Sequence, residues 1–241
     1  MTGGIQPRAE SKRGDDELLG PLMVLTTTTG VVDAISFVGL GHVFTANMTG
    51  NVVFIGFALG GAHELSLRRS LAALGAFATG AMVAGYVTNR GAIRTPQRQL
   101  AFGAGTEAAL LLISAVIAVG QSPPLSSSSA YALIVLTALA MGVRNAVIRK
   151  LAVADVTTTV LTLTITGLLG DAPFVGGHGT RSGRKALSIL LMFAGALIGT
   201  VLLLNWGFMI PLALSALLAL AVTVVVVRRA PKGRLATTAN D

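Results

Sequence analysis

Asp33 is a carboxylate inside an apolar run, residues 18–41, that is long enough to cross a bilayer. A helical spacing of three and four residues places hydroxyl side chains on the same face: Thr26, Thr29 and Ser36. A charged side chain at the bilayer centre costs at least about 2.5–3.5 kcal/mol, so Asp33 must face protein or water and have a partner. It therefore either binds a solute or a proton, or accepts structural hydrogen bonds that tie helices together.

Hydroxyl and amide side chains also gather in two later stretches. The first, HVFTANMTGN, holds Thr45, Asn47, Thr49, Gly50 and Asn51. The second, VTTTVLTLTITG, holds Thr157, Thr158, Thr159, Thr162, Thr164 and Thr166. Gly50 permits the backbone to leave a helical path, and freed backbone groups persist at membrane depth only where protein or a cavity receives them. The side chains then either coordinate a solute or a cation, or hydrogen-bond their own helix.

Signatures of enzymes and metal sites are missing from the sequence. It has no Cys, and His42, His63 and His178 are scattered without a paired Glu or Cys. The HExxH, GxSxG and GxxxxGK[ST] patterns do not occur. No nucleophile and base stand out as a pair. We therefore expect no catalytic residue, no metal, no cofactor and no enzymatic activity.

The composition indicates where these side chains reside. Of the 241 residues, 53% are hydrophobic and 12% are charged, and the mean hydropathy is +0.76. Soluble domains carry roughly 25% charged residues. The net charge of +8 would suggest a nucleic-acid partner in a soluble chain, but this composition argues against one. The lipid bilayer is the expected partner.

Eight apolar runs predict an all-α polytopic membrane protein. They cover residues 18–41, 43–62, 70–88, 100–120, 130–148, 156–170, 186–205 and 208–227. Residues 1–17 form a polar N-terminal tail, and residues 228–241 form a basic C-terminal tail. The transmembrane domain, 18–227, divides at the loop QSPPLSSSS into a first half, 18–120, and a second half, 130–227.

The two halves resemble each other as copies of one four-segment unit. GVVDA at 30–34 matches GVRNA at 142–146, which pairs Asp33 with Asn145. The other matched pairs are Thr49 with Thr162, Asn51 with Thr164, and Gly80 with Gly195. Such self-similarity predicts a two-fold internal repeat. Because Arg144 adjoins Asn145, the pseudo-symmetry suggests Arg144 as the partner of Asp33.

The Lys and Arg residues distinguish six crossings from eight, since they favour the cytoplasmic side. If all eight runs cross, the basic residues outside are Arg90, Arg94, Arg98, Arg144, Arg149 and Lys150. If the second run of each half dips in and returns, only Arg68 and Arg69 lie outside. The charges favour six crossings plus two re-entrant or broken segments, with eight crossings as the alternative. Both termini would be cytoplasmic, and the second half would be inverted, as in secondary transporters.

Small residues spaced by four indicate close helix packing. The pairs with this spacing are Gly195 and Gly199, Gly80 and Ala84, and Gly56 and Gly60. Because the spacing is common inside single membrane proteins, it favours contacts within one chain over contacts across a dimer.

Two runs carry a resemblance to a known family: GVVDAISFVGLGHVFTANMTGN and GVRNAVIRKLAVADVTTTVLT. Both resemble the YoaK-type family of bacterial integral membrane proteins, which is defined as a domain of unknown function. The resemblance extends from about Gly20 to Arg228. The family pattern has Thr-Gly where this chain has Thr162 and Leu163, so the resemblance does not support a glycine hinge in the second half. It implies a multi-pass protein of the bacterial inner membrane and supplies no substrate or catalytic residue.

These observations favour a small secondary transporter or channel-like protein that moves an unidentified small solute. Its site would lie at the midplane, where the two halves meet. The residues expected to line it are Asp33, Asn47, Thr49, Gly50, Asn51, Arg144, Asn145, Thr162 and Thr164. The chain is small for a complete transporter, which fits a homodimer. The alternative is a non-transporting membrane scaffold or stress-related protein whose buried polar residues specify helix packing.

Overall fold

Helices are the regular elements in the part of the chain that the computed structural model describes. That part comprises residues 6–91, 93, 95–123, 125–151, 161–171 and 182–229. In chain order the elements are α1 (Gln6–Ala34), the π-helix η1 (Ile35–Gly39), α2 (Met48–Leu59), α3 (Leu67–Asn89), α4 (Pro96–Ile117), α5 (Ser127–Leu151), α6 (Leu161–Gly170), α7 (Ser182–Trp206) and α8 (Met209–Arg229). The predicted all-α fold is confirmed.

Six of these helices are long and apolar enough to cross a membrane. They are α1 with η1 from Glu17, α3, α4, α5, α7 and α8. The two others, α2 and α6, have 12 and 10 residues, fewer than the roughly 20 that a bilayer core requires. The structure therefore has six long helices and two shorter apolar ones, which is the polytopic arrangement expected from the sequence.

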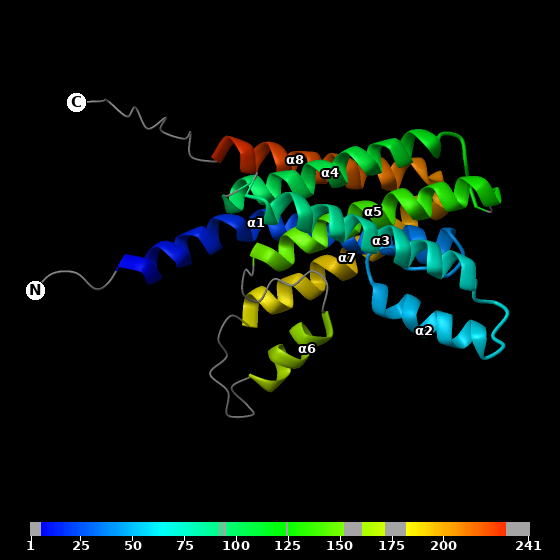
Figure 1. Ribbon diagram of the computed structural model, residues 1–241. Coiled ribbons are helices and arrows are strands. Elements are labelled where there is room, and N and C mark those ends of the chain that lie inside the picture. Colours follow the sequence, from blue (N-terminus) through cyan, green and yellow to red (C-terminus); the bar gives the residue numbers. More distant parts are fainter. Residues whose placement is uncertain are drawn as a thin grey trace, which may run out of the picture.

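The long helices run along a common direction and pack against one another in pairs (Figure 1). α1 lies against α7, α3 lies against α5, and α4 lies against both α5 and α8. The short helices lie beside this bundle, with α2 next to α3 and α6 next to α7. In Figure 1, α2 runs from near the middle of the bundle toward one end, whereas α6 runs toward the opposite end.

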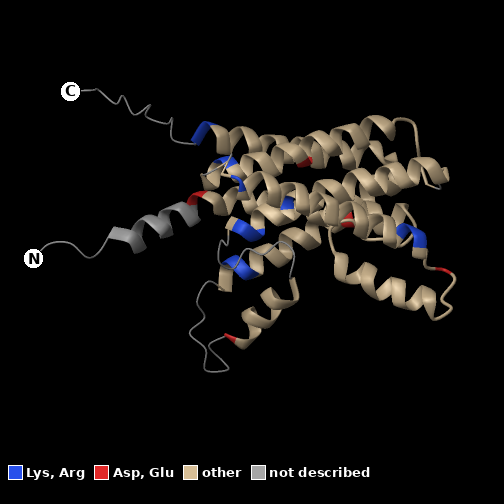
Figure 2. Cartoon of the chain, in the orientation of Figure 1, with Lys and Arg blue, Asp and Glu red and all other residues tan. Residues whose placement is uncertain are grey.

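Most Lys and Arg residues of the described chain lie at one end of the bundle (Figure 2). The last turns of α5 and α8 lie there, and they carry Arg149 with Lys150 and Arg228 with Arg229. The start of α3, with its own basic stretch, lies at the opposite end (Figures 1 and 2). This separation of charge along the bundle is the pattern that membrane proteins show across a bilayer.

The chain leaves its helical path between η1 and α2, as the sequence predicts. Gly41 and His42 have positive φ angles of 86° and 56°, and the next helix begins at Met48. The prediction that Gly50 provides this break is wrong, because Gly50 lies inside α2. A Cβ on Gly50 would lie 2.6 Å from the ring of Phe44, so the glycine makes room for that ring.

The contact between α1 and α7 depends on glycines at the crossing. A Cβ on Gly30 would lie 2.2 Å from the carbonyl oxygen of Met192. A Cβ on Gly195 would lie 2.2 Å from the carbonyl oxygen of Thr27, and one on Gly199 would lie 2.8 Å from Cα of Val31. The two backbones therefore touch directly, and the small-residue spacing of α7 serves packing within the chain, as expected.

The contact between α3 and α5 has the same character. A Cβ on Gly142 would lie 2.1 Å from the carbonyl oxygen of Phe77, and one on Gly80 would lie 2.3 Å from that of Leu139. The third small-residue pair behaves differently, since no atom of the described chain lies within 4 Å of a Cβ built on Gly56. Two of the three predicted spacings thus form helix contacts within the chain.

We expect Gly142→Ala to destabilise the protein by about 1–3 kcal/mol, the usual cost of overpacking a tight contact. The added methyl group would lie 2.1 Å from the backbone of Phe77. Thermal unfolding of the detergent-solubilised protein measures this as a lower Tm. Gly75→Ala on α3 is the matched control, because nothing lies within 4 Å of its added methyl group and Ala favours a helix. Equal Tm values for the two variants would contradict the close crossing.

Candidate functional site

A buried ion pair lies between three of the long helices. Nη1 of Arg144, on α5, is 2.9 Å from Oε1 of Glu107, on α4, and both side chains have no exposed surface. The same Nη1 donates to Oγ1 of Thr28 at 2.9 Å and to the carbonyl oxygen of Leu25 at 3.1 Å. Nη2 donates to Oγ1 of Thr29 at 2.7 Å. The guanidinium therefore joins α1, α4 and α5 through charge-assisted hydrogen bonds.

The carboxylate of Asp33 has different partners from those predicted. It accepts a hydrogen bond from the backbone N–H of Ala46 at 3.1 Å and another from the side-chain amide of Asn47. The predicted pair between Asp33 and Arg144 is wrong, since the carboxylate bound to Arg144 belongs to Glu107. The reason is position, because Asp33 lies one helical turn beyond Thr29, where the non-helical segment before α2 meets α1.

Glu107 is the functional candidate that sequence reasoning missed. It is an acidic residue within the apolar run 100–120, so the argument applied to Asp33 applies equally to it. Its side chain is fully buried, and Oε1 also accepts a hydrogen bond from Thr28 at 2.9 Å. An acidic residue within an apolar run was the available signal.

The polar face predicted for α1 is buried, but much of it serves its own helix. Thr26 donates to the carbonyl oxygen of Leu22, and Ser36 donates to that of Asp33. Thr29 makes such a bond to Leu25 as well as receiving Arg144. The structural reading therefore holds for Thr26 and Ser36, while Thr29 also serves the ion pair.

Some of the predicted site residues in the HVFTANMTGN stretch are buried in the protein, and others are exposed at its surface. Asn51 is fully buried, and its side-chain oxygen accepts a hydrogen bond from the backbone N–H of Phe44 at 3.0 Å. Asn47 binds Asp33, so both amides hold the non-helical segment in place. Thr49 is exposed at the start of α2 and does not face this cluster.

The predicted residues of the second half also separate. Asn145 is buried beside Arg144 on α5, whereas Thr164 is buried on α6, which packs against α7. Thr162 is exposed on α6. Residues 157–159 lie outside the described residues, as does 178. The nine predicted residues thus do not form a single cluster in the part of the chain that the structure describes.

Several buried polar side-chain atoms have no hydrogen-bond partner among the described residues. Both polar atoms of the Asn145 side chain are in this state, as are Oε2 of Glu107, Nε of Arg144 and Oγ1 of Thr45. Buried polar groups are nearly always hydrogen-bonded, so each exception calls for an explanation. At the ion pair, these atoms leave one acceptor on Glu107 and one donor on Arg144, and the amide of Asn145, the next residue along α5, is also without a partner there.

No group of three or more His, Asp or Glu residues that could hold a metal ion occurs within the described residues. Another ion pair joins Lys185 and Asp171 at 2.8 Å, near the basic end of the bundle. Asp171 is 52% exposed, so this pair lies in a far more polar setting than that of Arg144. The buried ionisable groups of the described bundle interior are therefore the pair of Arg144 with Glu107 and the carboxylate of Asp33.

Comparison with known proteins places this site in a family context. The model of the family described as protein of unknown function (DUF1275) matches residues 21–225. The chain is 33% identical over 150 residues to the UPF0700 transmembrane protein YoaK of Bacillus subtilis (strain 168). That alignment covers 62% of this chain and 65% of the relative, which is just under two thirds of the relative's length. No solved structure matches the chain.

Removal of one partner of the buried pair should cost more than removal of both. Arg144→Met leaves Glu107 buried without its cation, and breaking such a pair costs about 3–5 kcal/mol. The double variant with Glu107→Met replaces the pair by apolar side chains and should recover most of that loss. Thermal unfolding in detergent gives the Tm of the wild type, of Arg144→Met and of the double variant.

Lys185→Met is the control for this series, because it also removes the cation of an ion pair. Its partner Asp171 is half exposed, so the loss should be below about 1 kcal/mol. A Tm loss for Arg144→Met no larger than that for Lys185→Met would show that the central pair does not hold the helices together.

Proposed function

The chain belongs to the DUF1275 family of proteins of unknown function, and from this premise we propose that it is a small secondary transporter or channel-like protein. The solute would bind at the buried polar centre formed by Arg144, Glu107 and Asn145. Intramembrane ionisable residues commonly mark the paths of solutes and protons. A small polar solute or anion would find there an acceptor, a donor and an amide side chain.

The observation that carries this proposal is the unpartnered amide of Asn145. Both of its polar atoms are buried without a partner among the described residues, and it directly follows Arg144 on α5. A side chain that served only packing would gain stability if it were apolar, because an unsatisfied buried polar group costs about 1–3 kcal/mol. Retention of an amide here is therefore better explained by a ligand than by stability.

The arrangement of the helices supports an inverted repeat as the framework of this transporter. Under the repeat, Gly30 corresponds to Gly142 and Gly80 to Gly195. Gly30 and Gly195 lie at the α1–α7 crossing, while Gly142 and Gly80 lie at the α5–α3 crossing. The two crossings thus exchange under the proposed symmetry. The opposite directions of α2 and α6 agree with it, and inverted repeats are common in secondary transporters (Figure 1).

We propose that the protein resides in the bacterial inner membrane with the basic end of the bundle in the cytoplasm. The end that carries the last turns of α5 and α8 holds most basic stretches (Figure 2). Positive residues favour the cytoplasmic side, so both chain termini would be cytoplasmic. The small size of the chain makes a homodimer the assembly that we expect.

Single cysteines should report this orientation, since the protein has no native Cys. In intact cells, Arg68→Cys should react with a membrane-impermeant thiol reagent, whereas Arg90→Cys should react only after the cells are opened. Both side chains are exposed, so access to the reagent decides the result. Labelling of Arg90→Cys in intact cells, with Arg68→Cys protected, would contradict this arrangement and favour either eight crossings or the reverse orientation. Labelling of both would show that α3, which separates the two positions, does not cross the membrane.

Proton flux provides the test of transport, because the bundle holds two buried carboxylates, Asp33 and Glu107. Liposomes that contain the purified protein and a pH-sensitive dye should take up protons along an imposed gradient while valinomycin and potassium clamp the potential. Asp33→Asn and Asn145→Leu should reduce this uptake to the rate of protein-free liposomes. Asn145→Leu should at the same time keep or raise the Tm, because it removes two unpartnered polar atoms.

Asn205→Leu is the matched control. Its exposed amide donates to the carbonyl oxygen of Val201 in its own helix, so the variant should conduct like the wild type. The scaffold alternative is favoured by the contacts of Arg144, on α5, to two other helices, α1 and α4, and it predicts no flux in any variant. A wild-type rate equal to that of protein-free liposomes would decide against proton-coupled transport.

A further inference from the structure

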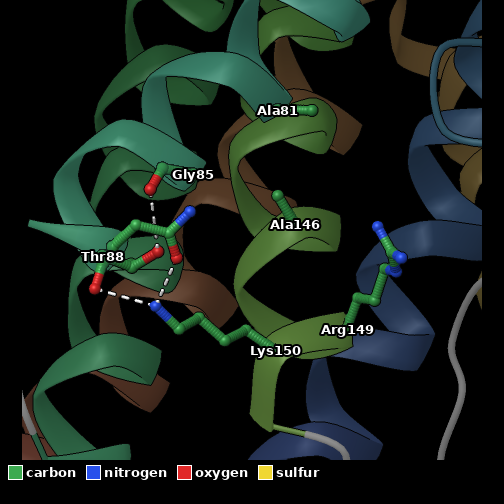
Figure 3. Close-up of a pocket in the computed structure, with 7 residues that line it drawn as sticks. Ala81, Gly85, Thr88, Ala146, Arg149 and Lys150 are labelled. Atoms are coloured by element: carbon green, nitrogen blue, oxygen red, sulfur yellow. Dashed lines mark hydrogen bonds between the residues drawn. The ribbon is translucent and has the colours of Figure 1, made fainter.

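A groove of about 400 Å³ lies between α3 and α5 at the basic end of the bundle (Figure 3). Its lining includes small residues from both helices: Ala81, Gly85 and Ala146. Nothing lies within 4 Å of a Cβ built on Gly85, so the space beside the α3 backbone is open. The groove therefore admits a ligand close to both helices.

Two cations border this groove, and they keep donors to spare. Nζ of Lys150 donates to the carbonyl oxygen of Thr88 at 2.8 Å and to Oδ1 of Asn89 at 2.7 Å (Figure 3). An ammonium group has three hydrogens, so one remains for a ligand. Arg149 is exposed and makes no hydrogen bond or ion pair within the described part of the chain. Neither cation has a carboxylate partner there, so their charge is available to an anion.

The neighbouring surface of α3 indicates that the groove lies at the depth of lipid headgroups. Met82 is 66% exposed and Tyr86 is 59% exposed, as expected for a helix face in contact with lipid. The guanidinium carbon of Arg90 lies 4.0 Å from the centre of the Tyr86 ring. Tyrosines and basic residues next to an apolar surface mark the membrane interface. A ligand in the groove would therefore reach both the cations and the acyl region.

We propose that this groove binds the phosphate-bearing headgroup of an anionic phospholipid. Arg149 and the free hydrogen of Lys150 would donate to the phosphate oxygens in charge-assisted hydrogen bonds. The small residues Ala81 and Gly85 would leave room for the glycerol and the first part of an acyl chain. Basic pockets between membrane helices recognise acidic lipids in this way. Continuity with the exposed apolar face of α3 favours a lipid over a free phosphate ion.

Native mass spectrometry of the purified protein, titrated with phosphatidylglycerol, tests the proposal. The double variant Arg149→Gln, Lys150→Gln should weaken the first bound lipid about thirtyfold, because one cation near acidic lipid is worth about fivefold, or about 1 kcal/mol. The control Arg228→Gln, Arg229→Gln removes the same charge from the same end of the bundle and should leave this affinity unchanged. An equal loss in both double variants would show that only the overall charge matters, and would overturn the site.

Two further variants keep the test valid if loss of Lys150 disturbs the packing of α3. Arg149→Gln removes no hydrogen bond within the described chain. It should lower the affinity for phosphatidylglycerol about fivefold, the loss expected for one cation. Gly85→Leu fills the groove without a change of charge and should also lower the affinity for phosphatidylglycerol. Unchanged affinity in both variants would overturn the proposal.

Two ligand controls identify the chemistry that the groove recognises. Phosphatidylcholine, which has no net charge, should bind more weakly than phosphatidylglycerol and show no dependence on Arg149. Inorganic phosphate should not displace phosphatidylglycerol, because it lacks the glycerol and acyl groups. Displacement by inorganic phosphate, with the same dependence on Arg149, would replace the lipid by a free phosphate ion as the ligand.

Discussion

A fully buried arginine constrains the rest of this structure. Arg144 has no exposed surface, and the cost of that burial must be met by a carboxylate and by oxygen acceptors within reach. Glu107 supplies the charge from α4, while Thr28 and Thr29 supply hydroxyl groups from α1. These contacts fix the relative positions of three helices, because a shift of one turn would leave the guanidinium without its acceptors.

The glycine crossings make this arrangement possible. Gly142 lies two residues before Arg144 and brings α5 against the backbone of α3. Gly30 lies one residue after Thr29 and brings α1 against α7. Two of the three helices that meet at the ion pair, α1 and α5, thus make a backbone contact with another helix within one turn of their polar residue. Close packing and polar recognition are therefore linked in the same two helices, and a change at one crossing would move the hydrogen-bonding groups.

The sequence predicts the fold better than it predicts the partners of each polar residue. The apolar runs locate the helices, because hydropathy acts locally, and the distribution of Lys and Arg favours six crossings over eight, in agreement with the six long helices. The pairing of Arg144 with Glu107 depends on how α4 lies against α5, and a one-dimensional pattern contains no such information. The prediction that Gly50 breaks the helix is wrong for a related reason, since this glycine makes room for the ring of Phe44 and does not bend the chain.

If the chain is the inverted repeat that we propose, its two halves differ in the charges that they bring to the centre of the bundle. In the alignment that matches Gly30 with Gly142, Arg144 corresponds to Val32, and Asp33 corresponds to Asn145. Charges repeated in both halves would place like charges near the pseudo-symmetry axis, where the low dielectric makes their repulsion costly. A cation from one half and an anion from the other, Arg144 and Glu107, neutralise each other instead. Under the proposed function, the neutral Asn145 would offer an amide to a solute without adding a charge, so the difference between the two proposed repeats would itself provide the recognition chemistry.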